Sequence, residues 1–99
     1  MDMEALMAQA AELQNKVAAA QEQLGKTMIK GIADGGACIV DMTAKYDMLK
    51  VTIRPDVLTR GADAVAEVVM AAYTDAKQKA DATIDRVMGA ATAGMPMPN

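Results

Sequence analysis

The first quarter of the chain carries an apolar residue at every third or fourth position, and neither proline nor glycine interrupts it between residues 2 and 24. This spacing gathers the apolar side chains on one face of an α-helix, in a seam that repeats every seven residues. Such a seam packs lengthwise against another helix. Residues 2–24 are therefore predicted to form one long helix that ends at Gly25. The seam consists of Met3, Leu6, Ala10, Leu13, Val17, Ala20 and Leu24.

In the middle of the chain the spacing of the apolar residues changes, and apolar and polar residues begin to alternate. Alternation indicates strands, because successive side chains of a strand point to opposite faces of the sheet. Short connections between consecutive strands require antiparallel pairing, so we expect a three-stranded antiparallel sheet. The predicted strands are Met28–Ile32, Ala37–Thr43 and Met48–Ile53, joined by a turn at Asp34-Gly35-Gly36 and a second turn over residues 44–47.

The alternation also predicts which side chains face the core. One face of the third strand is apolar, and the second strand has a matching set; together they are Leu49, Val51 and Ile53 with Cys38, Val40 and Met42. Lys50, Thr52 and Arg54 are expected on the opposite face. Cys38 is the only cysteine, so no disulfide forms within the chain, and it is interpreted as a small buried apolar residue.

A second long helix is predicted over residues 62–91. The two helices would be about 35 and 42 Å long, whereas a six-residue strand spans only about 20 Å. One face of the sheet cannot cover both helices, so we expect them to pair beyond the sheet and a second copy of the chain to cover what remains. The prediction is an α+β fold in one domain, residues 1–94, followed by a flexible Met/Pro tail, residues 95–99.

The composition argues against an enzyme. The chain has no histidine and no serine, which removes most nucleophile–base pairs and the usual metal ligands. Asp34-Gly35-Gly36 lacks the Gly-Lys-Ser/Thr of a phosphate-binding loop. We therefore predict no catalytic residues, no metal site, no cofactor and no small-molecule substrate.

The chain is also expected to be cytoplasmic and not to associate with a membrane. It begins with the acidic segment Met1-Asp2-Met3-Glu4, unlike a signal peptide, and contains no apolar run of about 20 residues. Its net charge of −3 is unevenly distributed, because residues 26–60 carry six cations against four anions whereas both helical ends are acidic.

Several segments in this order resemble the YbaB/EbfC family of bacterial nucleoid-associated proteins. They are the amino-terminal seam, the hairpin Lys30-Gly31 to Gly35-Gly36, the run Val51-Thr52-Ile53-Arg54-Pro55-Asp56-Val57-Leu58, the helical segment Ala71-Ala72-Tyr73-Thr74-Asp75-Ala76 and the Met-Pro-Met-Pro tail. The resemblance covers essentially the whole chain. The chain departs from the family pattern at Arg54, where an acidic residue is usual, and at Ala44, near a usual glycine.

The resemblance implies a homodimer with protruding helices that binds duplex DNA with little sequence preference, in nucleoid organisation or gene regulation. The candidate phosphate-binding residues on the helices are Lys16, Lys77, Lys79 and Arg86, and a second candidate surface carries Lys50 and Arg54. Leu6, Leu13, Val17 and Leu24 are the candidate contacts of the dimer or helix seam. The alternative is a dimeric protein–protein interaction module without DNA binding, which the acidic helices and the ten methionines would also suit.

Overall fold

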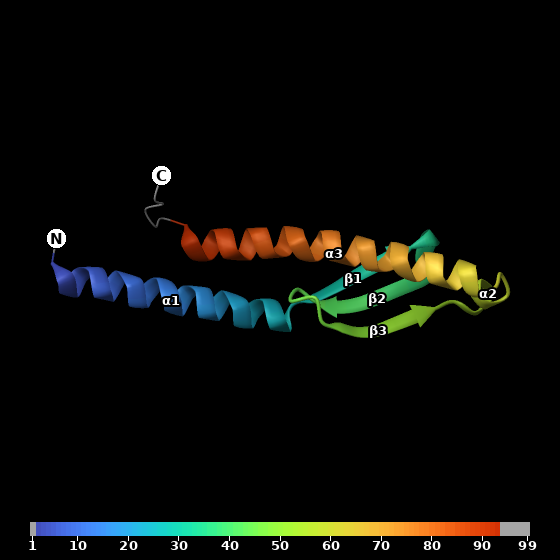
Figure 1. Ribbon diagram of the computed structural model, residues 1–99, viewed down its shortest axis with the longest axis horizontal. Coiled ribbons are helices and arrows are strands. Elements are labelled where there is room, and N and C mark those ends of the chain that lie inside the picture. The colour runs from blue at the N-terminus through green and yellow to red at the C-terminus, as the bar shows by residue number, and fades with distance from the viewer. Residues whose placement is uncertain (1, 94–99) are drawn as a thin grey trace.

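The structure, a computed structural model, describes residues 2–93. Its three strands form one antiparallel sheet in the order β1-β2-β3 (Figure 1). One long helix precedes the sheet in the chain and another follows it, which confirms the predicted α+β fold. The predicted tail, residues 95–99, lies outside the described residues. The elements are α1 (Met3–Lys26), β1 (Met28–Ala33), β2 (Cys38–Thr43), β3 (Met48–Ile53), α2 (Pro55–Leu58) and α3 (Ala62–Thr92), with a short 3-10 turn at Asp34–Gly36.

The molecule is elongated, with principal extents of 68 × 24 × 17 Å and a radius of gyration of 19.2 Å. A compact chain of this length would have a radius of gyration of about 13 Å. The first half of α3 lies on the sheet, and α1 leads away from the sheet beside the second half of α3 (Figure 1). We call α1 together with residues 79–92 of α3 the helical arm. The two helices pair beyond the sheet, as their lengths predicted.

Helix α1 is capped by side chains at both ends. The Asp2 carboxylate accepts a hydrogen bond from the Glu4 N–H at 3.2 Å, which is the usual N-cap arrangement. At the other end, the Thr27 hydroxyl donates to the Gln23 carbonyl at 2.7 Å. The predicted helix, residues 2–24 with Gly25 as its stop signal, was two residues short at this end, because the chain stays helical through Lys26 and turns at Thr27.

The apolar seam of α1 is buried at only one end. Leu24 is 4% exposed and belongs to the core of its own chain, Leu13 and Val17 are half-buried, and Leu6 is 40% exposed. Leu24 thus lies in the core of its own chain, and the role of these four residues as contacts of the dimer or helix seam stays a prediction. The outer part of the seam, around Leu6, is left uncovered by the chain itself.

Helix α3 approaches β1 unusually closely at Gly31. A Cβ atom on Gly31 would lie 2.1 Å from the Ala72 carbonyl oxygen and 2.6 Å from the Ala76 Cβ. Ala72 and Ala76 at this contact, and Ala80 one turn further along α3, are fully buried. Small side chains on both elements thus allow the helix backbone to lie directly on the strand.

This close approach lets two helix side chains bind the outer edge of β1. The Ile32 N–H donates to Asp75 Oδ2 at 2.9 Å, and the Lys79 ammonium donates to the Lys30 carbonyl at 2.9 Å. Asp75 and Lys79 also pair with each other at 2.9 Å. We call Asp75 and Lys79 the edge cap, because they occupy backbone groups that an edge strand otherwise leaves open.

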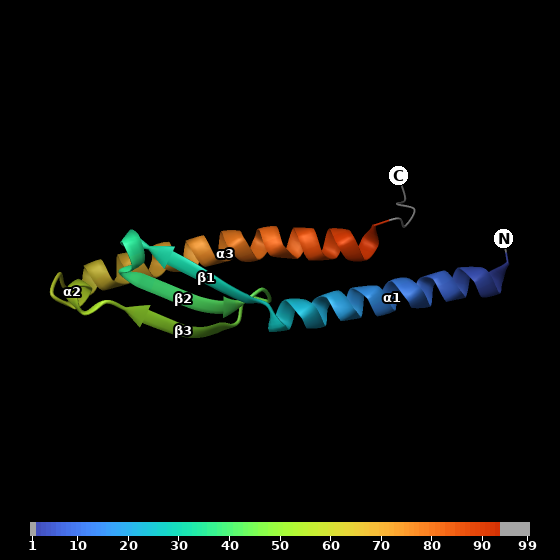
Figure 2. The same ribbon diagram turned by 180° about the vertical axis from the view of Figure 1, so that it is seen from behind.

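The helix covers β1 and β2 but not β3 (Figure 2). Cys38, Val40 and Met42 are fully buried, as predicted. In β3 only Ile53 is half-buried, while Val51 is 38% exposed and Leu49 lies beside a register shift at Asp41/Met42. The prediction that all three apolar residues of β3 face the core of the chain was therefore wrong. Apart from Ile53, which packs against the core, β3 is left exposed by residues 2–93.

The turn between β2 and β3 is attached to both helices. Ala44 is buried and donates its N–H to the Thr27 carbonyl at 3.0 Å, and Tyr46 adopts the positive φ of 70° that such turns require. The Tyr46 hydroxyl donates to Asp81 of α3. This hydrogen bond, followed by burial and the Asp81 charge, raises the pKa of Tyr46.

Candidate nucleic-acid interface

Most of the ten lysines and arginines form surface ion pairs. Lys16 pairs with Glu12 at 3.4 Å, Lys77 with Asp81 at 3.7 Å and Lys79 with Asp75 at 2.9 Å. Within residues 2–93, the cations that form no ion pair are Lys45, Lys50 and Arg86. Exposed ion pairs contribute only about 0–1 kcal/mol each, so a phosphate can compete for a paired lysine.

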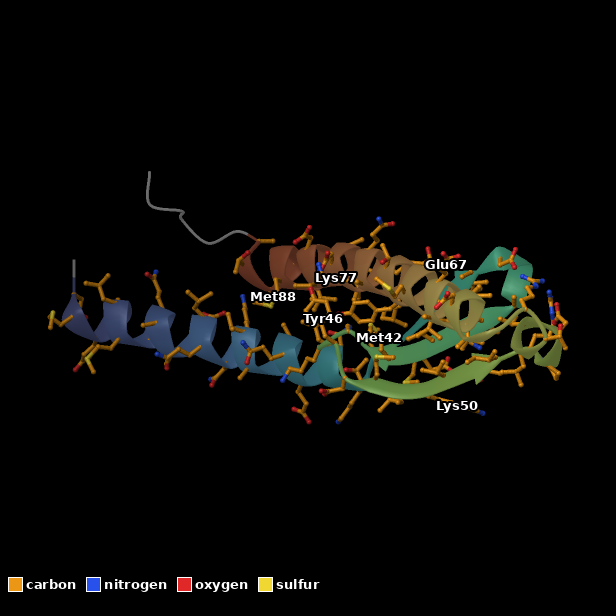
Figure 3. All side chains as sticks on the ribbon, turned by 45° about the vertical axis from the view of Figure 1, so that its right-hand side comes forward. Met42, Tyr46, Lys50, Glu67, Lys77 and Met88 are labelled. Carbon is orange, nitrogen blue, oxygen red and sulfur yellow. The ribbon has the colours of Figure 1, made fainter. Side chains whose placement is uncertain are left out.

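The four candidate cations of the helices do not share one side. Lys79 and Arg86 are seven residues, or two turns, apart on α3 and lie on the side of the helix toward β1, where Lys79 contacts the Lys30 carbonyl. Lys77 lies on the other side of α3 with Asp81 and Tyr46, toward the turn between β2 and β3 (Figure 3). The structure therefore separates Lys77 from Lys79 and Arg86.

Lys16 faces the same groove as the end of α3. Together with Val87, Ala90 and Ala91, it lines a groove of about 330 Å³ between the two helices of the arm. Ala90 follows Arg86 by one helical turn and lies on the same side of α3. We call Lys16, Lys79 and Arg86 the basic side of the arm.

The two residues of the second candidate surface, Lys50 and Arg54, differ in their contacts. Lys50 lies on the open face of the sheet, opposite Asp41 in the register of β2 and β3. Arg54 precedes α2, and its guanidinium binds the Asp56 carboxylate, which lowers the pKa of Asp56 and raises that of Arg54. Arg60 then joins Asp56 to Asp34. Arg54 is thus part of an ion-pair network that attaches α2 to the hairpin turn.

No group of three His, Cys, Asp or Glu residues within 2–93 is arranged to hold a metal ion. Burial raises the pKa of the Cys38 thiol, so this cysteine is not activated as a nucleophile. In the part of the chain that the structure describes, no helix is both long and apolar enough to cross a membrane.

Comparison with known proteins identifies the family. The model of the YbaB/EbfC DNA-binding family matches residues 1–95. The chain belongs to this family. One relative, a nucleoid-associated protein of Bordetella avium (strain 197N), is 38% identical over 93 residues, which is 94% of this chain and 86% of that protein.

A solved structure shares the fold. The crystal structure of an uncharacterized protein from Helicobacter pylori superposes with a TM-score of 0.77 at 16% sequence identity, over 88% of this chain and 92% of that chain. At this identity the likeness concerns the arrangement of helices and strands.

Sequence reasoning did not find the roles of Asp75, Tyr46 and Asp81. Asp75 lies within the family-like segment and Asp81 further along α3, and each binds a group far away in the sequence. A partial signal existed, since Asp75 and Lys79 have the spacing of a helical ion pair. No local pattern indicates that this pair also binds the edge of β1.

Proposed function

We propose that this protein is a homodimeric, cytoplasmic, nucleoid-associated protein that binds duplex DNA through phosphate contacts with little sequence specificity. Its family and the nucleoid-associated relative support DNA binding. The observation that carries the site is Arg86, an exposed arginine that forms no ion pair within residues 2–93 and lies on the basic side of a projecting arm. A role in gene regulation would follow from the presence of this protein on DNA and requires no site besides the DNA-binding one.

The residues of the basic side suit phosphates better than bases. Lys16 and Arg86 end in flexible, exposed cationic groups, which position a protein on the DNA backbone and carry no sequence information. Lys79 contributes charge but is committed to the edge cap at two contacts of 2.9 Å. We therefore assign the direct contacts to Lys16 and Arg86. With one phosphate for each of these residues in both protomers, the dimer would contact about four phosphates.

The exposed surface supports a dimer. The chain exposes 6724 Å². A compact monomer of its mass, 10.4 kDa, would expose about 5,400 Å². The excess of about 1,300 Å² exceeds the roughly 800 Å² that each partner contributes to an interface of standard size.

Binding to a random-sequence duplex, followed by fluorescence anisotropy at several salt concentrations, tests the proposed function. With about four phosphate contacts, the logarithm of the affinity should fall by about 3.6 per decade of salt. Arg86→Gln should weaken binding and lower that slope by about 1 for each Arg86–phosphate contact that is lost. The matched control is Lys77→Gln, which removes the same charge from the other side of α3 and should leave both values near those of the native protein.

Two results would contradict this assignment. Equal effects of Arg86→Gln and Lys77→Gln would mean that only net charge matters and that the basic side of the arm is not the site. Absence of binding at about 50 mM salt, where phosphate contacts are strongest, would remove the DNA function itself. The protein–protein interaction module would then be the better description of this acidic chain.

A further inference from the structure

The outer edge of β1 is held by the edge cap. The Ile32 N–H points to α3 and not to β2, and this direction alternates along an antiparallel strand, so Lys30 also turns its backbone groups outward. Asp75 accepts the Ile32 N–H, and Lys79 donates to the Lys30 carbonyl, both at 2.9 Å. The edge cap therefore occupies one donor and one acceptor near the middle of a six-residue edge.

The edge cap differs from the other ion pair of α3. Asp75 and Lys79 are four residues apart and pair at 2.9 Å, and both are also bonded to the backbone of β1. Lys77 and Asp81 have the same spacing on the other side of α3, but within residues 2–93 they reach no backbone group of a strand. The close approach of α3 at Gly31 brings only the first pair within reach of the sheet edge.

β1 has few other features that would keep another strand away. Natural edge strands are protected by charged residues, prolines, bulges or short length. β1 contains one charge, Lys30, and no proline, and its register with β2 has no shift. Two apolar side chains on its outer face, Met28 and Ile32, are 60% and 45% exposed. Without the edge cap, β1 would present a regular, partly apolar edge with free backbone groups.

We propose that the edge cap closes an interaction surface, and that the partner it excludes is β1 of another copy of this chain. The donor and the acceptor that the cap holds are complementary to each other. In an antiparallel pair of β1 strands centred on Gly31, the Ile32 N–H of each copy faces the Lys30 carbonyl of the other. The same two backbone groups thus bond either to α3 or to a second copy. The inference concerns association beyond the proposed homodimer and does not depend on DNA binding.

The side chains of β1 favour the same register. Paired residues point to the same face of the sheet, so the sum of their numbers is even. A pairing centred on Lys30 would place two lysines directly opposite each other, which destabilises a sheet. A pairing centred on Ile29 would place Ile32 opposite Lys26, which belongs to α1. Centring on Gly31 avoids both, because Lys30 then lies opposite Ile32.

Removal of the edge cap tests the proposal. In Asp75→Ala/Lys79→Ala the net charge stays at −3, and alanine favours the helix, so the main change is the release of the β1 edge. In sedimentation over a range of protein concentrations, the average mass of this variant should rise to at least twice that of the native protein. The matched control is Glu22→Ala/Lys26→Ala, which removes an exposed pair of the same spacing and charge from α1 and should keep the native mass.

A third substitution shows whether the association uses the edge of β1. Proline has no N–H group and is accepted on an edge strand where that group points outward. Adding Ile32→Pro to the double variant should therefore return the average mass to the native value. Association caused by general loss of structure would instead persist or increase, because proline does not restore the contact between α3 and β1.

Two single variants keep the test decisive if the double variant loses helix content by circular dichroism. Lys79→Met keeps the apolar stem but frees the Lys30 carbonyl, and its average mass should rise with protein concentration. Lys79→Arg keeps a donor for the same carbonyl and should retain the native mass. Equal masses of these two variants at every concentration would overturn the proposal.

Three further results would also overturn it. A double variant with native helix content and native mass at every concentration would mean that the edge cap excludes no partner. Large species that persist after Ile32→Pro is added would mean that the chains associate through another surface. Equal association of the Glu22→Ala/Lys26→Ala control would mean that loss of any surface ion pair is sufficient.

Discussion

Replacing Gly31 by alanine tests whether the contact between α3 and β1 organises the molecule. The added Cβ atom would lie 2.1 Å from the Ala72 carbonyl oxygen and 2.6 Å from both the Cβ and the backbone nitrogen of Ala76. Carbon atoms pack at about 3.5–4.0 Å, so α3 would have to move by about 1 Å. No flexible side chain can absorb this displacement, because two of the three atoms are backbone.

The cost can be estimated from what the displacement disturbs. Overpacking a core typically costs about 1–3 kcal/mol. A movement of about 1 Å would also stretch the two 2.9 Å hydrogen bonds from the edge cap to Lys30 and Ile32, which flank Gly31, beyond ordinary hydrogen-bond length. We therefore expect Gly31→Ala to lower the free energy of unfolding by about 3 kcal/mol, a large share of the 5–15 kcal/mol typical of a domain.

Urea denaturation at a fixed protein concentration, followed by circular dichroism, measures this change. Gly89→Ala is the matched control: Gly89 lies inside the same helix, and a Cβ there meets nothing within 4 Å. It should raise the free energy of unfolding by about 0.5–1 kcal/mol, because alanine favours the helix. If Gly31→Ala unfolded within 0.5 kcal/mol of the native protein, the close packing of α3 on β1 would not be a determinant of stability.

Three further predictions concern titratable groups. The hydrogen bond from the Ile32 N–H, and then that from Lys79, lowers the pKa of Asp75 below its value in the unfolded chain. The carboxylate therefore stabilises the fold above about pH 4, and this stabilisation is lost as the pH falls through the folded pKa. In urea denaturation the free energy of unfolding should fall as the pH is lowered through this range, and Asp75→Asn should make that fall smaller. An unchanged acid profile in that variant would contradict this account. The phenol of Tyr46 should ionise above about pH 10 in an ultraviolet titration, and Asp81→Asn should bring its pKa down. Cys38 should react with a thiol reagent slowly in the native protein and rapidly in urea; fast native reaction would mean that the core opens readily.

Local patterns in the sequence predicted much of the architecture. The apolar spacing of residues 2–24 and 62–91 predicted both long helices, and the third strand was predicted with the bounds observed for β3. These elements depend on interactions between residues that are close in the sequence. Apolar side chains that repeat about every 3.6 residues indicate a helix, and those that repeat every 2 residues indicate a strand. The same period predicted that Lys79 and Arg86 share one side of α3. Membership of the YbaB/EbfC family was also predicted, from an ordered set of segments.

Contacts between distant residues could not be predicted in this way. Asp75 and Lys79 bind residues of β1 that lie 43 and 49 positions earlier, and Tyr46 binds Asp81 across 35 positions. These partners meet because Gly31 allows α3 to lie directly on β1. The same placement leaves β3 exposed except at Ile53, although its apolar face looks as buried in the sequence as that of β2. The helices, the strands and the faces that their side chains share could be predicted from the sequence, because they follow from local backbone geometry. Which of these faces the chain covers could not, because that depends on where one rigid helix lies on a three-stranded sheet.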